Sequence, residues 1–241
     1  MQIIDAVWEK RNLGVTTQEV TVSISDTTES IKTTLQGLNA QYQVIKIPAG
    51  YIEPMWMLED EGFHYTETTV HVVHHLKNLE LMGPLQRIDA QLTYERMNEN
   101  DVDQMYDEIR KGLFYTDRIA LDPFFSFEQA CGRYVGWIHD EIEKGTEIYK
   151  YIYKDKTVGF FTFKEIEEGI YYPFLAGIYK EYQKSPLGML YTYKPLIEAK
   201  KRNGKCISTY ISMNNSNAVR MHAQFGFEFK EVNNVYIRHC S

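Results

Sequence analysis

The chain contains an internal repeat that limits the folds open to it. Residues 58–75 (LEDEGFHYTETTVHVVHH) and 222–239 (HAQFGFEFKEVNNVYIRH) follow the same pattern. Each begins as the tail of a helix and passes through Gly-Phe, with another aromatic residue two positions on. Each then continues as a polar and β-branched strand that ends in His. A repeated supersecondary unit indicates a repeated fold fragment, so we expect two related α/β halves in one chain.

Composition and charge exclude several classes of protein. The 241 residues are 44% hydrophobic and 24% charged, which suits a folded chain with one large core or two smaller ones. The formal net charge of -7 argues against a nucleic-acid partner, which needs Lys and Arg massed on one face. No apolar run approaches the ~20 residues of a membrane span and the first residues lack a leader pattern, so we expect a cytoplasmic protein with no membrane partner. Reduced thiols are expected, because no C-x-x-C pair occurs and the cysteines are odd in number: Cys131, Cys206 and Cys240.

The first part of the chain predicts a compact α/β unit. Apolar residues alternate over 20–24, which predicts a strand, and they recur four and three apart over 31–38, which predicts a helix. Residues 42–47 predict another strand, and a short helix closing at Gly62 precedes a further strand.

Gly83 and Pro84 interrupt the pattern and predict a domain boundary. We therefore expect an N-terminal domain over 1–83 and a second domain over 84–241. The second domain is predicted to begin with a strand and a capped helix and to continue as an antiparallel meander, with these elements over 90–96, from Asn100, and over 147–153, 157–163 and 170–178.

Residues 207–227 (ISTYISMNNSNAVRMHAQFGF) predict a β-branched strand, two asparagines and a short helix that ends at Gly-Phe. They fit a motif of Asn, two residues, Ala, three residues, usually Tyr, three residues and Gly-Phe, at Asn215, Ala218, His222, Gly226 and Phe227. This segment resembles the closing half of the acetyl-CoA-dependent N-acetyltransferases of the GNAT superfamily. The resemblance implies an acyltransferase with an α/β (α+β) fold, in which helices flank a mixed, mostly antiparallel sheet after a partial GNAT-like N-terminal unit.

The resemblance also implies a binding site for acetyl-CoA. The family's pyrophosphate loop opens a helix whose free N–H groups and dipole attract phosphate. Residues 183–189 match that loop, except that Pro186 replaces its first glycine and removes one N–H donor. In the family, the strand before the loop parts from the strand after the helix, and the pantetheine arm fills the gap. The implied cofactor-binding residues are Leu175, Ala176, Gly177, Ile178, Gln183, Lys184, Ser185, Leu187, Gly188, Met189 and Asn215.

Cations follow the loop at the end of the next helix. Lys201 or Arg202 could reach a CoA phosphate, although cations at a helix C-terminus are common for dipole reasons. The N-terminal half has no phosphate-type glycine pattern over 25–38, so we expect it to lack a cofactor site of its own.

His222 stands where the family has the Tyr that protonates the departing thiolate. An imidazole with an unperturbed pKa of ~6.5 can donate that proton near neutral pH, so the resemblance implies a catalytic His222. The alternative is that His222 packs its helix, and Tyr210 or a water would then be the next candidate donor. Spacing does not identify a general base.

Residues 117–138 carry a narrower resemblance. Arg118, Asp122, Tyr134 and Trp137 are similar to the segment before the first β-hairpin in the TDP-fucosamine acetyltransferase-like group, which acetylates a nucleotide-linked amino sugar. The resemblance implies that Arg118, Asp122 and Tyr134 bind a small-molecule amine acceptor. The structural alternative is an Arg118–Asp122 ion pair that holds a loop.

Three functions remain open on these observations. The first is acetyl transfer to a small amine, the second is acetylation of a protein or peptide, and the third is a non-catalytic acyl-CoA-binding module. A deep cleft walled by 117–138 would favour the first and an open acidic groove the second, whereas Pro186 and the missing Tyr support the third. A homodimer is compatible with each.

Four histidines raise the question of a metal site: His64, His71, His74 and His75. On one strand, His71 and His75 share a face but lie ~13 Å apart, and His74 points to the opposite face. We therefore expect strand-surface histidines and no metal.

Overall fold

The computed structural model describes residues 1–240. Their strands form one eleven-stranded sheet of order β1-β2-β3-β11-β4-β10-β8-β7-β6-β5, with β9 paired to β7 off this path. The strands are β1 (Gln2–Asp5), β2 (Thr17–Thr21), β3 (Tyr42–Pro48), β4 (His64–His74), β5 (Leu92–Arg96), β6 (Glu147–Tyr153), β7 (Lys156–Glu167), β8 (Ile170–Tyr172), β9 (Ala176–Ile178), β10 (Cys206–Ser212) and β11 (Glu228–His239). The helices are α1 (Val7–Leu13), α2 (Thr28–Gln36), α3 (Ile52–Asp60), α4 (Pro84–Asp89), α5 (Glu99–Arg110), α6 (Arg118–Leu121), α7 (Phe127–Glu143), α8 (Tyr193–Lys201) and α9 (Ser216–Gln224), with short 3-10 helices at Lys180–Tyr182 and Pro186–Met189.

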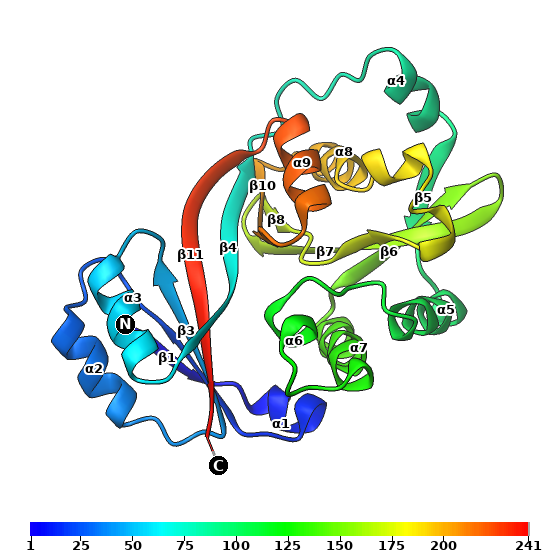
Figure 1. Cartoon of the computed structure of the whole chain (residues 1–241). Coiled ribbons are helices and arrows are strands. Elements are labelled where there is room, and N and C mark those ends of the chain that lie inside the picture. Colours follow the sequence, from blue (N-terminus) through cyan, green and yellow to red (C-terminus); the bar gives the residue numbers. More distant parts are fainter. Residues whose placement is uncertain (241) are drawn as a thin grey trace.

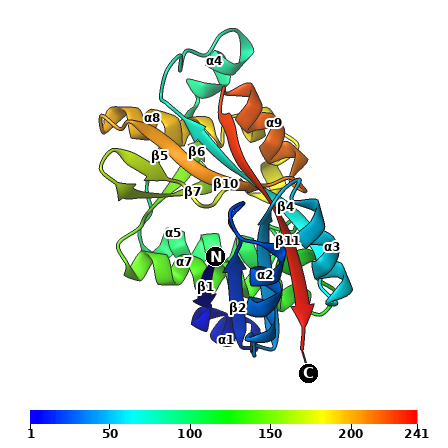
Figure 2. The same cartoon turned by 90° about the vertical axis from the view of Figure 1, so that its left-hand side faces the viewer.

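The N-terminal part of the chain contains strands and helices of the kinds predicted from the sequence. Thr27 caps α2 by accepting a hydrogen bond from the Ser30 N–H, which satisfies a donor that the helix cannot satisfy itself. The apolar stripe of this helix places Ile31 and Leu35 against the strands in one buried cluster. Figure 2 shows α2 and α3 beside the strands of this unit.

The two halves exchange their last strands. β4 of the N-terminal half pairs antiparallel with β10, whereas β11 of the C-terminal half pairs antiparallel with β3. β4 and β11 also pair with each other, and they run side by side through the middle of the molecule (Figure 1). These are the two strands of the sequence repeat, so the repeat is structural. One continuous sheet joins the halves, and the boundary predicted at 83/84 falls in the connection between β4 and α4.

Helices cover both faces of the C-terminal half. α8 and α9 lie above its strands in Figure 1, whereas α5, α6 and α7 lie below them. Among residues 1–240, no helix is both long and apolar enough to cross a membrane.

Several predicted elements have different bounds. The strand expected over 20–24 is β2 at Thr17–Thr21, and the helix expected over 31–38 is α2 at Thr28–Gln36. The helix expected to begin at Asn100 begins at Glu99, because Asn98 forms a capping box with Asp101. The strand expected over 90–96 begins at Leu92, because α4 takes up the residues before it. The single strand expected over 170–178 is wrong, since the chain forms β8 and β9 with a break between them.

Candidate active site

The break between β8 and β9 opens the sheet. Pro173 has no N–H to give to a strand ladder, and Leu175 is held instead by Thr162 of β7. The Leu175 N–H donates to Thr162 Oγ1 at 3.0 Å, and the Leu175 carbonyl accepts from the Thr162 N–H at 2.8 Å. Within residues 1–240, β10 follows β8 in parallel only at Cys206 and Ile207, and β9 pairs only with β7. β9 and β10 therefore part, as the resemblance implied.

A cavity of about 790 Å³ includes this opening. Leu175, Ala176 and Thr209 line it at the parting strands. Helices α8 and α9, with the residues just before each, contribute a second set of lining residues: Tyr191, Thr192, Pro195, Asn215, Ala218 and His222. From β4 and the segment through α6 and α7, it is lined by Glu67, Thr69, Asp117, Arg118, Arg133, Tyr134 and Trp137. The cavity thus joins the implied cofactor side to the implied acceptor side.

The structure brings only some of the implied cofactor-binding residues to this cavity. Leu175, Ala176 and Asn215 line it. Ile178 is 4% exposed in the core, and a Cβ on Gly177 would lie 3.3 Å from a Leu113 side-chain carbon. Gly177 and Ile178 thus shape β9 and are absent from the lining found among residues 1–240.

Backbone N–H groups of the loop 183–189 are already used in local hydrogen bonds. The Ser185 N–H donates to the Tyr182 carbonyl at 2.9 Å, and the Gly188 N–H donates to the Ser185 carbonyl at 3.3 Å. The Leu187 N–H donates to Ser185 Oγ at 3.3 Å, and the Leu187 side chain is buried. The loop was expected to open a helix; it opens the 3-10 helix Pro186–Met189, and α8 begins only at Tyr193. A phosphate at these N–H groups would have to replace the internal bonds.

The remaining residues expected in this loop are Gln183, Lys184 and Met189. Gln183 Nε2 donates to the Ile178 carbonyl at 3.2 Å, which ties the loop to the end of β9. Lys184 is exposed, and Met189 ends the 3-10 helix. In residues 1–240, the cavity lining includes no residue of 183–189, so a role for the loop in binding phosphate stays a prediction.

Asn215 has a structural role besides any contact with a ligand. Its side-chain oxygen accepts a hydrogen bond from the Ala218 N–H at 3.0 Å and so caps α9. This cap fixes the start of the helix that carries His222.

His222 is buried, with its side chain at the cavity. Its Nδ1 lies 2.8 Å from the Ala218 carbonyl, to which it donates, and its ring meets the Phe227 ring edge-on at 4.6 Å. Burial lowers the pKa of His222 to about 4, so the ring is neutral at neutral pH. At neutral pH the ring therefore carries no proton on Nε2 that it could donate. A neutral ring with Nδ1–H bonded leaves Nε2 as an acceptor.

The predicted Arg118–Asp122 ion pair is also wrong. Arg118 Nη2 lies 2.5 Å from Glu19 Oε1 and 3.8 Å from Glu9 Oε1. Asp122 Oδ2 instead pairs with His239 Nε2 at 2.7 Å. Burial alone would raise the pKa of Glu19, but Arg118 and Lys46 together lower it to about 2. The implied acceptor residues therefore separate: Arg118 lines the cavity, whereas the buried Asp122 is absent from the lining found among residues 1–240.

Tyr134 lies at the cavity beside a second buried arginine. Its ring packs on Phe114 with centroids 4.8 Å apart, and burial raises the pKa of Tyr134 well above its ordinary value. Arg133 Nη2 pairs with Glu9 Oε1 at 2.7 Å, and its guanidinium lies over the Trp137 ring. Two arginines and three aromatic rings thus form this wall of the cavity.

Sequence reasoning missed Glu67. Its side chain is 3% exposed, it lines the cavity, and its Oε2 has no hydrogen-bond partner among residues 1–240. Burial raises the pKa of Glu67, although the Arg118 charge and hydrogen bonds from the Ser212 side chain and the Arg118 backbone oppose the shift. The one sequence signal was a carboxylate within a β-branched strand. The same repeat position in β11 holds Glu231, whose side chain is 72% exposed.

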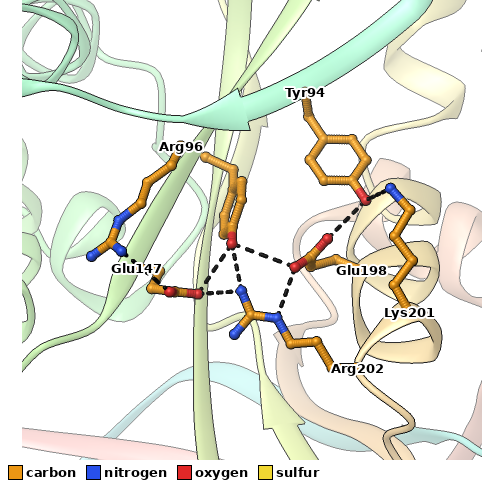
Figure 3. A network of polar contacts seen from close by, with 7 residues as sticks. Tyr94, Arg96, Glu147, Glu198, Lys201 and Arg202 are labelled. Atoms are coloured by element: carbon orange, nitrogen blue, oxygen red, sulfur yellow. Dashed lines mark hydrogen bonds and ion pairs between the residues drawn. The ribbon is translucent and has the colours of Figure 1, made fainter.

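Lys201 and Arg202 are held away from the role of CoA phosphate ligands. Lys201 donates to the Tyr94 hydroxyl at 2.7 Å. Arg202 donates to Glu198 at 2.7 Å and to Glu147 at 2.5 Å. Figure 3 shows these contacts joining the end of α8 to β5 and β6. The structural alternative is favoured for both cations.

The histidines of β4 do not form a cluster. His74 is buried and accepts a hydrogen bond from the Leu76 N–H, so the expectation of a strand-surface residue is wrong for it. His71 lies 2.6 Å from Glu231 and 2.7 Å from Ser208. Residues 1–240 contain no group of three potential ligands that could hold a metal ion.

No family model and no curated protein matches the chain. Several solved structures, however, are similar to it in fold. A functionally unknown conserved protein from Staphylococcus epidermidis ATCC 12228 has a TM-score of 0.60 at 12% identity, over 94% of this chain and 85% of that one. A GCN5-related N-acetyltransferase from Kribbella flavida has a TM-score of 0.57 at 11% identity, over 94% and 82% of the two chains.

A tandem GNAT protein from the clavulanic acid biosynthesis pathway has a TM-score of 0.53 at 12% identity, over 88% of this chain and 68% of that one. At such identities the likeness shows the fold, which is that of the GNAT N-acetyltransferases. The predicted fold class, with a mixed sheet flanked by helices, is thereby confirmed. The tandem neighbour also agrees with two related halves in one chain.

Proposed function

We propose that the protein is an acyl-CoA-dependent N-acyltransferase that moves an acetyl group directly to the primary amine of a small molecule. The observation that carries the proposal is the parting of β9 from β10 with a cavity in the opening. A strand edge without a partner leaves backbone hydrogen-bonding groups free for an extended ligand such as pantetheine. The proposal includes the cytoplasmic location expected from the sequence.

Acetyl-CoA would lie with its pantetheine arm between Leu175, Ala176 and β10, near Asn215. The loop 183–189 would bind the pyrophosphate through backbone N–H groups after its internal bonds open. Bound acetyl-CoA supplies an activated acetyl thioester.

The acceptor is proposed to be a small amine, most specifically a nucleotide-linked amino sugar. The resemblance of residues 117–138 supports this choice, and so does their place in the cavity wall, where Arg118 and Arg133 are buried. A deep cleft walled by this segment is what a small acceptor requires, whereas a peptide would need an open groove. Both arginines already pair with carboxylates, Arg118 with Glu19 and Arg133 with Glu9, so an anionic group on the acceptor would have to share them.

His222 is proposed to pass a proton to the departing sulfur. Because its ring is neutral, Nε2 must first accept a proton before it can donate one. A low pKa makes the protonated ring short-lived and a strong donor, which suits a relay during the reaction. The motif position supports this role, and packing of α9 is the alternative.

Calorimetry with acetyl-CoA and an assay of CoA release test the proposal together. The amine panel should contain amino sugars, nucleotide-linked amino sugars, amino-acid amides and short peptides with free N-termini. Binding with turnover on amino sugars supports the proposal, and turnover confined to peptides supports the protein-acetylating alternative. Binding without turnover on any amine supports a non-catalytic acyl-CoA-binding module. No affinity for acetyl-CoA at millimolar concentration contradicts all three.

A further inference from the structure

Five carboxyl groups line the cavity in the region of β2, β4, α6 and α7, and four of them are neutralised by cations. The four are Glu19 with Arg118 and Lys46, Asp117 with Arg133, Asp140 with Arg11, and Glu141 with Lys144 and Lys164. The fifth, Glu67, forms no ion pair within residues 1–240.

Ion pairs reduce the ability of a carboxylate to take up a proton. Lys164 and Lys144 lower the pKa of Glu141 although burial raises it, and Glu19 falls to about 2. A carboxylate with a pKa that low is too weak a base to take a proton from an ammonium near neutral pH. Glu67 differs because the effect of burial on its pKa is larger than the effect of its neighbours, so the pKa is raised.

The strand exchange brings Glu67 to the cavity. β4 belongs to the N-terminal half, but its Thr69 pairs with Ser212 of β10 in the C-terminal half. Glu67 lies two residues before Thr69, and both line the cavity. Glu67 pairs with Val235 of β11, which carries no charge. Two charged groups act on the pKa of Glu67: Arg118 of α6 lowers it, and Asp117, which caps α6, raises it.

We propose that Glu67 is the general base of the reaction, taking the proton that the acceptor must lose before its nitrogen can attack. This inference rests on the proposed function. It assigns to the N-terminal half a direct part in the chemistry, although we expect that half to bind no cofactor of its own.

The step balances in protons and electrons. The ammonium of the acceptor gives one proton to the Glu67 carboxylate, directly or through one water, and its nitrogen lone pair becomes free. The nitrogen then bonds to the acetyl carbon, and the carbon–sulfur bond breaks with its electron pair on sulfur. The second nitrogen proton passes to the sulfur, through His222 in our proposal, and Glu67 returns its proton to solvent.

The test compares wild type with Glu67→Gln, which keeps the shape of the side chain but cannot act as a base. Acetyl-CoA binding by calorimetry should be unchanged, which also shows that the variant is folded. With the best acceptor of the amine panel, kcat should fall by about 10²–10⁴-fold at neutral pH. The loss should shrink as pH rises toward the pKa of the amine, because more of the acceptor then arrives unprotonated.

Glu95→Gln is the matched control. Glu95 lies on β5 at the far edge of the sheet, its side chain is 60% exposed, and the variant should keep wild-type kcat. Glu67→Asp should restore part of the activity. If wild type turns over but Glu67→Gln keeps kcat within a few-fold while chemistry limits the rate, Glu67 is not the base and the proposed function stands. If the wild-type protein shows no CoA release with any amine of the panel, both the role of Glu67 and the proposed function are overturned.

Discussion

The carbonyls of Leu58 and His222 accept equivalent hydrogen bonds, from the N–H groups of Phe63 at 2.9 Å and of Phe227 at 3.0 Å. The glycine before each Phe has a left-handed φ, of 80° in Gly62 and 79° in Gly226. The two helix ends are therefore copies of one another. Leu58 is buried in the core, whereas its counterpart reaches the cavity. One position thus supports packing in one half and a polar ring at the cavity in the other.

The first prediction concerns His222. His222→Phe should keep α9 packed and acetyl-CoA binding nearly unchanged, while kcat falls by about 10²–10⁴-fold because the proton relay is lost. His222→Tyr should retain substantial activity and shift the pH profile, because a phenol loses its proton only near ~10. Steady-state kinetics across pH checks both variants. If His222→Phe changes thermal stability more than kcat, the residue is a packing counterpart of Leu58.

The second prediction is that one acetyl-CoA binds per chain. In the N-terminal half, β2 and β3 stay paired in parallel from Thr17–Tyr42 to Thr21–Lys46, so no gap opens between them. In the C-terminal half, the corresponding parallel pairing of β10 with β8 covers two positions and then ends. Calorimetry should give a stoichiometry near one, and a value near two would contradict the unequal halves.

The sequence predicted the local elements well where local signals were strong. Turn residues Lys154 and Asp155 mark the β6–β7 hairpin, and both take the positive φ that this turn needs. Residues 207–227 predicted β10 and α9, with the helix ending at Gly-Phe directly before β11. The strand exchange was not predicted, because pairing partners far apart in sequence leave no periodic signal.

The candidate site was harder to predict than the fold. Leu175, Ala176, Asn215 and His222 reached the cavity because their spacing follows a local motif. The partners of Arg118 come from α1 and β2, and no spacing rule relates such distant carboxylates to it. Glu67 shares this difficulty, since only the exchanged position of β4 makes it a cavity residue.

The third prediction separates structure from substrate binding at Arg118. Arg118→Met should lower the free energy of unfolding by about 3–5 kcal/mol, because it leaves the buried Glu19 carboxylate without its main partner. Adding Glu19→Gln should recover part of that loss. Arg110→Met, which breaks an exposed pair with Asp107, should cost less than ~1 kcal/mol. Urea unfolding measures all three. An Arg118→Met protein of wild-type stability with weakened acceptor binding would assign the arginine to substrate alone.

The fourth prediction is a pH-dependent gain in stability in Glu67→Gln. The pKa of Glu67 is higher in the folded than in the unfolded state, so its stabilising effect is present below the unfolded pKa of about 4.5 and is lost as pH rises through the folded value. Glutamine cannot ionise and avoids this loss. The increase in Tm over wild type should therefore be larger at about pH 8 than at about pH 5. Equal shifts at both pH values would show that ionisation of Glu67 is not responsible.

The fifth prediction concerns the network in Figure 3. Arg202→Met should lower stability by about 1–2 kcal/mol, because Glu147 and Glu198 lose a charged donor. Acetyl-CoA affinity should stay within about twofold of wild type, an energy difference below ~0.5 kcal/mol. Lys201→Met should behave in the same way with a smaller loss of stability. A tenfold weaker affinity for acetyl-CoA in either variant would show that the substituted residue binds a CoA phosphate.

The exchanged strands determine when the N-terminal half can complete its fold during synthesis. Until β11 has left the ribosome, β3 and β4 lack their shared neighbour, and each presents an unpaired edge to other chains. The N-terminal half therefore cannot complete its sheet while the rest of the chain is being made, unlike a domain that folds as soon as it emerges. Nascent chains that stop before β11 should aggregate through these edges. The strand exchange that brings Glu67 to the cavity thus also makes the solubility of the N-terminal half depend on β11.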